Sequence, residues 1–302
     1  SAAPAPSPEL RKLLDFVRGR LAIQSGDYRA ARQWDEQALA AAALESAGGA
    51  ELPPEKLELL ALLRKDYAFT LEQTGDAAKA VSLMRQRLDA DQSALGPEHT
   101  QVLIDKLELA EAMDTQATPD PAGEKLIEQV LPGLDRSLGP DNIYKAQALD
   151  ELGSWAMNRH DWPRAVDVFG QAYQLALRMH GPRHQQTLGE AFNLGYVLER
   201  DGRHGEARTR LDEALQLAQS ELGAATPMAQ LIGYTLANAE LALGQAGAAR
   251  GAAHGLSAAA LDSVEPGNDW PSRLNLLGAE LAYAESPSEA RRQQLAAALS
   301  AI

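Results

Sequence analysis

The feature that most constrains this chain is a joint that recurs four times at a nearly constant interval. The copies are Leu95-Gly96-Pro97-Glu98-His99, Leu138-Gly139-Pro140-Asp141-Asn142, His180-Gly181-Pro182-Arg183-His184 and a degraded Leu222-Gly223-Ala224-Ala225-Thr226-Pro227. The glycines stand at 96, 139, 181 and 223, so the steps are 43, 42 and 42 residues. Glycine ends a helix in the left-handed conformation, and proline fits the first turn of the next helix. Each joint therefore predicts a helix end followed by a helix start.

A second, weaker turn divides each interval. These turns are Gly26-Asp27-Tyr28, Gly75-Asp76, Thr118-Pro119-Asp120-Pro121, His160-Asp161-Trp162-Pro163, Gly202-Arg203, Gly244-Gln245 and Ser286-Pro287. Each unit is thus predicted to be helix, turn, helix, turn. Trp162, directly before Pro163, is predicted to start the second helix of its unit.

A pair of small residues spaced by twelve positions marks every unit. Small side chains allow two antiparallel helices to approach closely, so each pair predicts the crossing point of one helix hairpin. The steps between units are 49, 42, 43, 42, 42 and 41 residues, and seven matches in step are not expected by chance even in an alanine-rich chain. The pairs are Gly19 and Ala31, Ala68 and Ala80, Ala110 and Ala122, Gly153 and Ala165, Gly195 and Ala207, Ala237 and Ala249, and Gly278 and Ala290.

The full pattern is similar to the tetratricopeptide repeat. A leucine precedes the small residue, an alanine follows twelve positions later, a bulky residue four after that, and another alanine three further on. The unit of about 42 residues exceeds the usual 34, and with its Leu-Gly-Pro joint it resembles the kinesin-light-chain-type subclass, which is abundant in bacterial multidomain proteins. The best examples are Leu194-Gly195, Ala207, Leu211, Ala214 and Leu152-Gly153, Ala165, Phe169, Ala172.

This resemblance implies an all-α fold, a right-handed superhelical solenoid of about seven antiparallel helix pairs. Residues 1–8, rich in proline and alanine, are predicted to be a linker to a larger protein. Residues 9–302 are expected to form one solenoid domain, with seven extra residues in a loop at 47–54. Three units depart from the pattern, since Asp35, Gln129 and Gln294 stand where an apolar or small residue is expected. The expected units are about 9–50, 51–95, 96–138, 139–180, 181–222, 223–264 and 265–302.

Composition removes several classes of function. The net charge of −14 and the absence of a long basic run argue against nucleic-acid binding. The chain has no cysteine, which excludes disulfides, zinc-thiolate sites and a cysteine nucleophile. No stretch is long and apolar enough for membrane insertion. The compartment stays open between cytoplasmic and periplasmic.

The six histidines are the first place to look for chemistry. His180 and His184 have the i, i+4 spacing of two metal ligands, but Gly181-Pro182 interrupts the helix that this would need. His99 and His184 occupy equivalent positions in two joints, which favours a structural role. No catalytic triad, phosphate-binding loop or metal cluster can be assembled from local spacing. We therefore expect no enzyme activity, no metal and no cofactor.

The resemblance implies a concave groove lined by the first helix of each unit. Groove-facing positions lie three before, one after, and four to five after the small residue. Aromatic rings beside amide and charged groups suit a peptide ligand, although such rings also complete the seams between helices. Phe192, Tyr196, Tyr234 and Asn238 form the strongest cluster across two units. The expected groove residues are Phe16, Arg20, Lys65, Phe69, Asn158, Phe192, Tyr196, Arg200, Tyr234 and Asn238.

The predicted function is a non-catalytic module that binds a protein or peptide, the acidity favouring a partner with basic residues. The alternative is a sensory or regulatory domain of a larger bacterial signalling protein, a kinase or transcriptional regulator, attached through the N-terminal linker. Self-association through either end of the solenoid is a further expectation.

Overall fold

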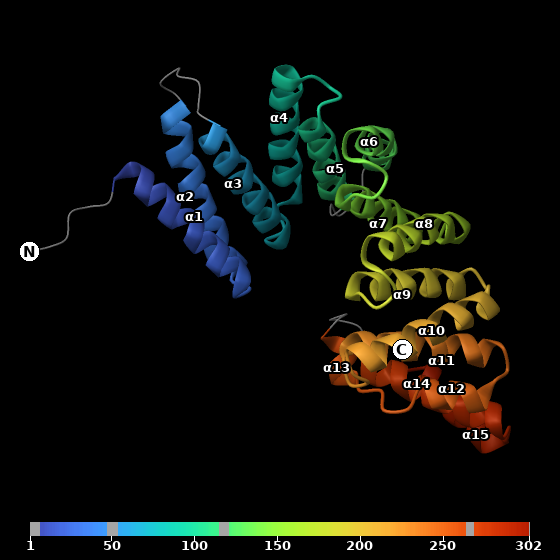
Figure 1. The fold of residues 1–302 in the computed structure, drawn as a ribbon. Coiled ribbons are helices and arrows are strands. Elements are labelled where there is room, and N and C mark those ends of the chain that lie inside the picture. The colour runs from blue at the N-terminus through green and yellow to red at the C-terminus, as the bar shows by residue number, and fades with distance from the viewer. Residues whose placement is uncertain (1–6, 47–53, 115–120, 264–268, 302) are drawn as a thin grey trace, which may run out of the picture. The chain divides into compact units, whose positions relative to one another are not determined.

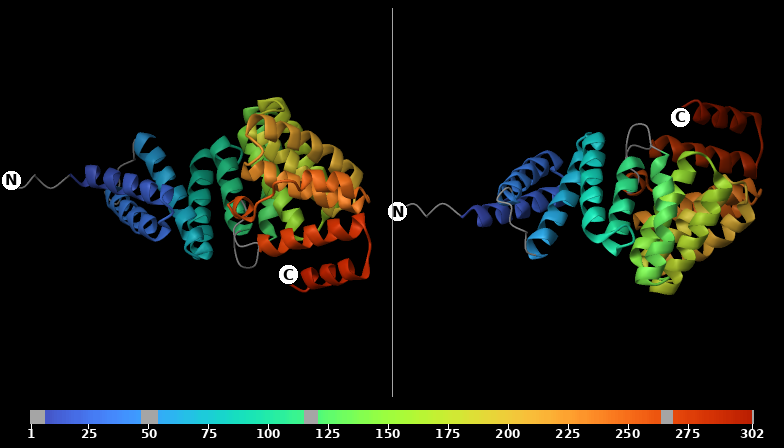
Figure 2. Two further views of the ribbon diagram at one scale, coloured as in Figure 1. Left: turned by 90° about the horizontal axis from the view of Figure 1, so that it is seen from below. Right: turned by 90° about the horizontal axis from the view of Figure 1, so that it is seen from above.

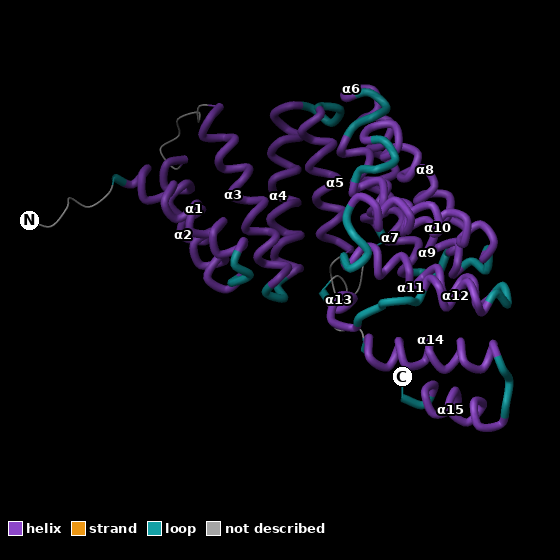
Figure 3. Tube along the Cα trace, turned by 60° about the horizontal axis from the view of Figure 1, so that its bottom comes forward, coloured by secondary structure: helices purple, strands orange, loops and turns teal. Residues whose placement is uncertain are grey.

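The computed structural model describes residues 7–46, 54–114, 121–263 and 269–301 (Figure 1). All regular structure within these residues is helical, in fifteen helices (Figure 3). The chain divides into two compact units, residues 1–140 and 141–302, each described by itself below. The expected loop at 47–54 and the turn at 118–121 lie largely outside the described residues, as do residues 1–6 of the expected linker. The single continuous solenoid stays a prediction.

The first unit contains three antiparallel helix pairs, and each helix packs mainly on its neighbours in the sequence. The helices are α1 (Pro8–Gln24), α2 (Tyr28–Ser46), α3 (Pro54–Gln73), α4 (Ala77–Leu95), α5 (Thr100–Asp114) and α6 (Ala122–Leu138).

The second unit continues the same order of packing, helix on next helix (Figures 1 and 2). As predicted, Trp162 is the first residue of its helix. The helices are α7 (Ile143–Asn158), α8 (Trp162–His180), α9 (Gln185–Arg200), α10 (His204–Glu221), α11 (Pro227–Ala242), α12 (Ala246–Ala252), α13 (Ala258–Asp262), α14 (Trp270–Glu285) and α15 (Glu289–Leu299).

The joints explain the helix boundaries, with one correction. Gly96, Gly139 and Gly181 follow the helix ends with φ of +88°, +85° and +79° and ψ of 156° to 172°, a region open essentially to glycine alone. The prolines after them were expected to open the next helices, and this is wrong. Each of the next helices begins three residues beyond its proline, at 100, 143 and 185; only Pro227 of the degraded joint opens a helix.

The residue before each of these helices caps it. His99 and His184 accept a hydrogen bond through Nδ1 from the backbone N–H two residues on, at 3.2 and 3.3 Å. Asn142 does the same through Oδ1 for Lys145, at 2.8 Å. Such caps satisfy N–H groups that have no partner inside the helix. The equivalent histidines therefore have the structural role that their spacing suggested.

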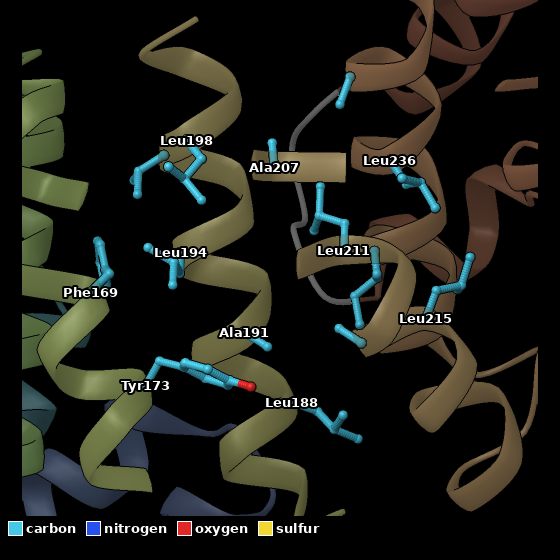
Figure 4. Packing of buried hydrophobic residues seen from close by; sticks show 14 of the residues in the cluster. Phe169, Tyr173, Leu188, Ala191, Leu194, Leu198, Ala207, Leu211, Leu215 and Leu236 are labelled. Atoms are coloured by element: carbon cyan, nitrogen blue, oxygen red, sulfur yellow. The ribbon is translucent and has the colours of Figure 1, made fainter. Parts of the chain in front are cut away.

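Five of the seven small-residue pairs lie buried, as predicted for crossing points. In the second unit the contact is so close that a Cβ on Gly195 would lie 2.5 Å from Cγ and Cδ2 of Leu211. A Cβ on Gly153 would overlap the ring of Phe169. Figure 4 shows these bulky side chains in the largest apolar cluster, together with Ala207 and Leu215. In these two pairs the bulky residue of the second helix thus packs directly on the glycine of the first.

The third pair is wrong by one residue, and the seventh pair is wrong at both of its positions. Ala122 is exposed, and the next residue, Gly123, is the buried one. Gly278 and Ala290 are both exposed, while Arg291 lies half-buried and donates from Nη1 to the carbonyl of Ala282 at 2.6 Å. In the third unit the buried crossing residues Ala110 and Gly123 are thirteen positions apart. α14 and α15 still form an antiparallel hairpin (Figure 3).

The sixth pair has a shortened second helix. α12 has seven residues, and a turn with Gly255 at φ +79° separates it from the five-residue α13. Glycines inside and after α12 weaken it, because each costs roughly 0.5–1 kcal/mol relative to alanine in a helix. The pair nevertheless crosses at the buried Ala237 and Ala249, as predicted.

Candidate functional site

The second unit contains a cleft of about 570 Å³ bordered by α9, α11, α14 and α15. Its walls combine three tyrosines, aliphatic side chains and four charged groups, two of each sign. Clefts of this size that combine apolar walls with a few polar groups are typical binding sites. The lining residues are Tyr196, Glu199, Arg200, Tyr234, Thr235, Asn238, Leu241, Ala242, Arg273, Glu280, Tyr283, Ala284 and Leu295.

Four of the expected groove residues meet in this cleft. Tyr196 and Arg200 come from α9, and Tyr234 and Asn238 from α11. Each stands at an inward position counted from the buried small residue of its helix, Gly195 or Ala237. Neighbouring first helices therefore present the same register positions to one cavity, which is the arrangement that the sequence rule assumed.

Aromatic packing fixes the wall that α11 provides. The rings of Tyr234 and Trp270 meet edge to face, with centroids 5.2 Å apart and an interplanar angle of 90°. Phe192, the fourth member of the predicted cluster, does not line the cleft. It packs half-buried against the buried cluster of Leu231, Leu261 and Trp270, with its ring 6.2 Å from that of Tyr196. Phe192 thus completes a seam between helices and supports the tyrosines from behind.

The polar groups of the cleft are also held in position. The amide of Asn238 donates to the backbone carbonyl of Tyr234 at 3.1 Å. The guanidinium of Arg200 lies over the ring of Trp162 at 5.3 Å, and that of Arg273 lies over Trp270 at 5.6 Å. Burial raises the pKa of the Glu280 carboxyl above its usual value.

The remaining expected groove residues lie elsewhere. Phe16 and Arg20 belong to α1, where the guanidinium of Arg20 lies over the ring of Phe16 and pairs with Asp66 at 3.2 Å. Phe69 is exposed on α3 and meets the ring of Tyr28 edge to face at 5.8 Å. The side chain of Lys65 lies outside the described part of the structure.

Asn158 is exposed at the last position of α7 and does not line the cleft. Membership of the groove by these residues stays a prediction.

Sequence reasoning missed the contribution of α14. Applying the same register rule to Gly278 yields Tyr283, five positions on, so the signal for this ring was present in the sequence. Arg273 and Glu280 also line the cleft from α14, at positions that the rule does not select. These residues close the cleft on the side opposite α9.

A second enclosed space of about 110 Å³ lies among α7, α8 and α9. Asp150 and Glu190 contact each other across it, with His180 and Gln186 also on its wall. Burial, followed by the charge of Glu190, raises the pKa of Asp150 to about 8; burial also raises the pKa of Glu190. Both carboxyl groups therefore keep their protons to a higher pH than a solvated carboxyl group does.

Other kinds of site have no support among the described residues. They contain no group of three histidine, aspartate or glutamate side chains arranged to hold a metal ion. The rings of His180 and His184 stack, with centroids 4.5 Å apart. None of the described helices combines the length and the apolar character that crossing a membrane requires.

Comparison with known proteins supports the repeat assignment. Residues 144–220 match the family model described as tetratricopeptide repeat. No curated protein matches the sequence.

Solved structures extend the likeness at the level of the fold. A kinesin-light-chain protein with nearly identical TPR-like repeats from Podosopora anserina is 21% identical, over 67% of this chain and 95% of that chain, with a TM-score of 0.58. BtubC (BKLC) from P. vanneervenii is 16% identical over 74% and 87%, with a TM-score of 0.63. The apo form of the quorum sensor NprR from B. thuringiensis is 14% identical over 97% and 77%, with a TM-score of 0.66.

The family match covers the two helix pairs with the strongest sequence signature, and the structural likenesses share their helix-pair fold. Repeats of this kind generally bind proteins or peptides and are generally non-catalytic. Residues 144–220 thus match the tetratricopeptide repeat family, and the fold of the chain is similar to that of kinesin-light-chain-type repeat proteins.

Proposed function

We propose that this chain binds a peptide segment of a partner protein in the cleft between α9, α11 and α14. The observation that carries the proposal is the meeting of Tyr196, Tyr234, Tyr283 and Asn238 around one open cavity. Tyrosine provides large contact area at a small entropic cost. The oxygen and the second N–H of the Asn238 amide can pair with the backbone of an extended ligand.

The charges of the cleft define the ligand more narrowly than the net charge does. The overall charge of −14 favours the approach of a segment with basic residues. Inside the cleft, however, Arg200 and Arg273 balance Glu199 and Glu280. A segment that carries an aromatic or aliphatic anchor flanked by charges of both signs fits these walls best.

Catalysis forms no part of this proposal. The raised pKa values of Asp150 and Glu190 arise from a closed seam, where a space of about 110 Å³ leaves no room for a peptide. The lining of the cleft contains a half-buried acid, Glu280, but no histidine, lysine, serine or cysteine. A binding module needs neither.

A peptide library displayed on phage tests the proposal. We expect the native chain to select related sequences, and their affinity to fall by about tenfold or more in a Tyr196→Ser, Asn238→Ala variant, because both side chains border the cavity and neither is fully buried. Tyr144→Ser is the matched control, since Tyr144 lies in the same unit, is likewise half-buried and stands outside the cleft.

Circular dichroism establishes that each variant remains folded. Selected peptides that bind the variant and the native chain equally would move the contact to another face. Loss of binding in the Tyr144→Ser control as well would indicate that the substitutions act through the fold.

The regulatory alternative rests on the likeness to a quorum sensor, which covers 97% of this chain. A receptor of that kind changes state when its ligand binds, whereas a scaffold need not. Hydrogen exchange of the native chain, measured with and without a selected peptide, distinguishes a receptor that changes state from a scaffold that does not. Protection limited to α9, α11 and α14 supports the binding module, and protection that extends through α1–α6 supports the regulator.

A further inference from the structure

Helix α1 has its apolar side facing solvent. Leu10, Leu13, Leu14, Val17 and Leu21 are 38–59% exposed, and they make up five of the twelve large apolar side chains exposed in the described structure. The other seven are scattered over six further helices and helix ends. Isolated exposed apolar residues are ordinary, but a contiguous stripe marks an interaction surface.

The opposite side of α1, which packs on α2, is polar. Lys12 and Asp15 are each 4% exposed. Gly19 lies on the same side of the helix, against the buried carboxylate of Asp35. The usual distribution for a terminal helix, apolar inward and polar outward, is therefore reversed. The solvent-facing leucines of α1 are suited to contact with another apolar surface, which is absent from the described structure.

The spacing of the stripe specifies the shape of that surface. Residues 10, 14, 17 and 21 follow each other by four, three and four positions, the 3.5-residue period of a helix–helix seam. The seam runs for eleven residues, about 16 Å at 1.5 Å per residue. A helix of about four turns packed nearly parallel or antiparallel would cover it.

The borders of the stripe are basic among the described side chains. Arg11 and Arg18 flank one side and Arg20 flanks the other, as the helical period requires. Arg18 pairs with the buried Asp15 at 3.1 Å, and Arg20 pairs with Asp66 at 3.2 Å. Their side chains nevertheless stay 52% and 56% exposed, so both guanidinium groups remain accessible to a ligand.

These borders decide between possible occupants. A second copy of α1, in either direction, would set guanidinium against guanidinium. A membrane surface is disfavoured because the stripe has no aromatic residue to insert at the interface. An acidic amphipathic helix meets both the seam and its borders.

We propose that the outer face of α1 docks an amphipathic helix of a partner protein, with leucine-type residues at a and d positions and acidic residues on both flanks. This surface is independent of the cleft in the second unit. Its recognition is helix on helix, whereas the cleft takes a peptide between helices. One chain thus offers two separate docking surfaces with different chemistry.

Two synthetic three-heptad peptides test this. Both have leucine at a and d; one has glutamate and the other lysine at e and g. Fluorescence anisotropy with the full chain should show the glutamate peptide binding about tenfold more tightly, the combined effect of two or three exposed ion pairs. A Leu14→Gln, Val17→Gln variant should lose that binding, and the control Leu62→Gln, a single exposed leucine on α3, should retain it.

Charge reversal sharpens the test. Arg11→Glu should reduce the difference in affinity between the glutamate and lysine peptides. It should leave the circular dichroism spectrum unchanged, because Arg11 is exposed. Equal binding of both peptides, no binding of either, or binding that survives the Leu14→Gln, Val17→Gln change would overturn the proposal. So would a dimer in sedimentation equilibrium, or pelleting with phosphatidylserine–phosphatidylcholine vesicles, that the same change abolishes.

Discussion

The first and fifth helix pairs cross in the same way and fill the crossing with opposite chemistry. In the fifth pair, Gly195 of α9 receives the side chain of Leu211 from α10. In the first pair, Gly19 of α1 stands at the equivalent position and receives the carboxylate of Asp35 from α2. The repeat thus fixes where two helices meet but leaves open what fills the contact.

The difference extends to the outer face of each helix. The fifth pair turns apolar side chains towards both neighbouring pairs, and they join one cluster with Phe169 and Ile232. The first pair keeps charge inside and leucine outside. The exposed leucines of α1 add to stability only when another surface covers them, because apolar burial is the main favourable contribution to folding. The comparison teaches that one crossing geometry can enclose an apolar core, as in α9–α10, or buried charge beside an exposed apolar helix face, as in α1–α2.

Adding a methyl group at the fifth crossing should give the largest effect. Gly195→Ala places a Cβ 2.5 Å from Cγ of Leu211, so the two helices must separate. We expect a loss of about 1–3 kcal/mol in the free energy of unfolding, measured by urea denaturation of the second unit's transition.

Gly189→Ala is the matched control on the same helix. A Cβ there meets nothing within 4 Å, so the substitution should stabilise α9 by roughly 0.5–1 kcal/mol. Equal effects of the two substitutions would show that helix propensity, and not close packing, governs these glycines.

Giving the first pair the chemistry of the fifth should stabilise it at alkaline pH. Asp35 is fully buried, with Thr70 donating to its Oδ2 at 3.2 Å, and burial raises its pKa to about 7. Asp35→Leu removes the cost of a buried charge, and we expect a gain of about 1–3 kcal/mol at pH 8, detectable in urea denaturation.

The pH profile gives the sign of the Asp35 effect. The unfolded carboxyl loses its proton near pH 3.8 and the folded one near pH 7. Between these values the folded state binds more protons, so stability is full below about pH 4 and declines until about pH 7. Asp35→Leu should flatten that part of the decline. A native profile that rises with pH over this interval would contradict the assignment.

The seam between α7 and α9 depends on pH in the same direction. Asp150 has a folded pKa of about 8 against an ordinary 3.8, so its contribution to stability declines from about pH 4 to about pH 8. Asp150→Asn keeps an N–H donor for Glu190 and removes one charge. We expect a gain of about 1 kcal/mol at pH 9 and little change at pH 5, both measured by urea denaturation.

Much of the fold follows from the sequence because single residue types are required at its fixed points. Only glycine readily adopts the backbone conformation seen at Gly96, Gly139 and Gly181. The bulky side chains at Phe169 and Leu211 need a glycine opposite them. These constraints are local in spacing, so a repeat of 42 or 43 residues makes them visible without coordinates.

The errors arose where two small or polar residues stand side by side. Ala122 and Gly123 are both small, so size alone does not choose between them. The apolar continuation does, since Ile127 and Val130 lie four and seven residues after Gly123 and are buried. The same count from Arg291 reaches Leu295 and Ala298, a register that a search for small residues passes over.

The candidate site was predictable where first helices keep the regular register, as for Tyr196, Tyr234 and Asn238. It was not predictable for Arg273 and Glu280, which line the cleft from positions of α14 that the register rule does not select. The outward leucines of α1 were also missed, because a helical apolar stripe in a sequence is ordinarily assigned to the core.

The smallest change in the free energy of unfolding is expected for a substitution that tests the thirteen-residue spacing of the third pair. Ala122 is exposed at the start of α6, so Ala122→Lys should change the free energy of unfolding by no more than about 0.5 kcal/mol. At Ala80, the buried crossing residue of the second pair, the same change would force an ammonium group into the contact between α3 and α4. If the crossing of the third pair were at Ala122, both substitutions would be severe. Urea denaturation of the two variants side by side therefore separates a spacing of thirteen residues from one of twelve.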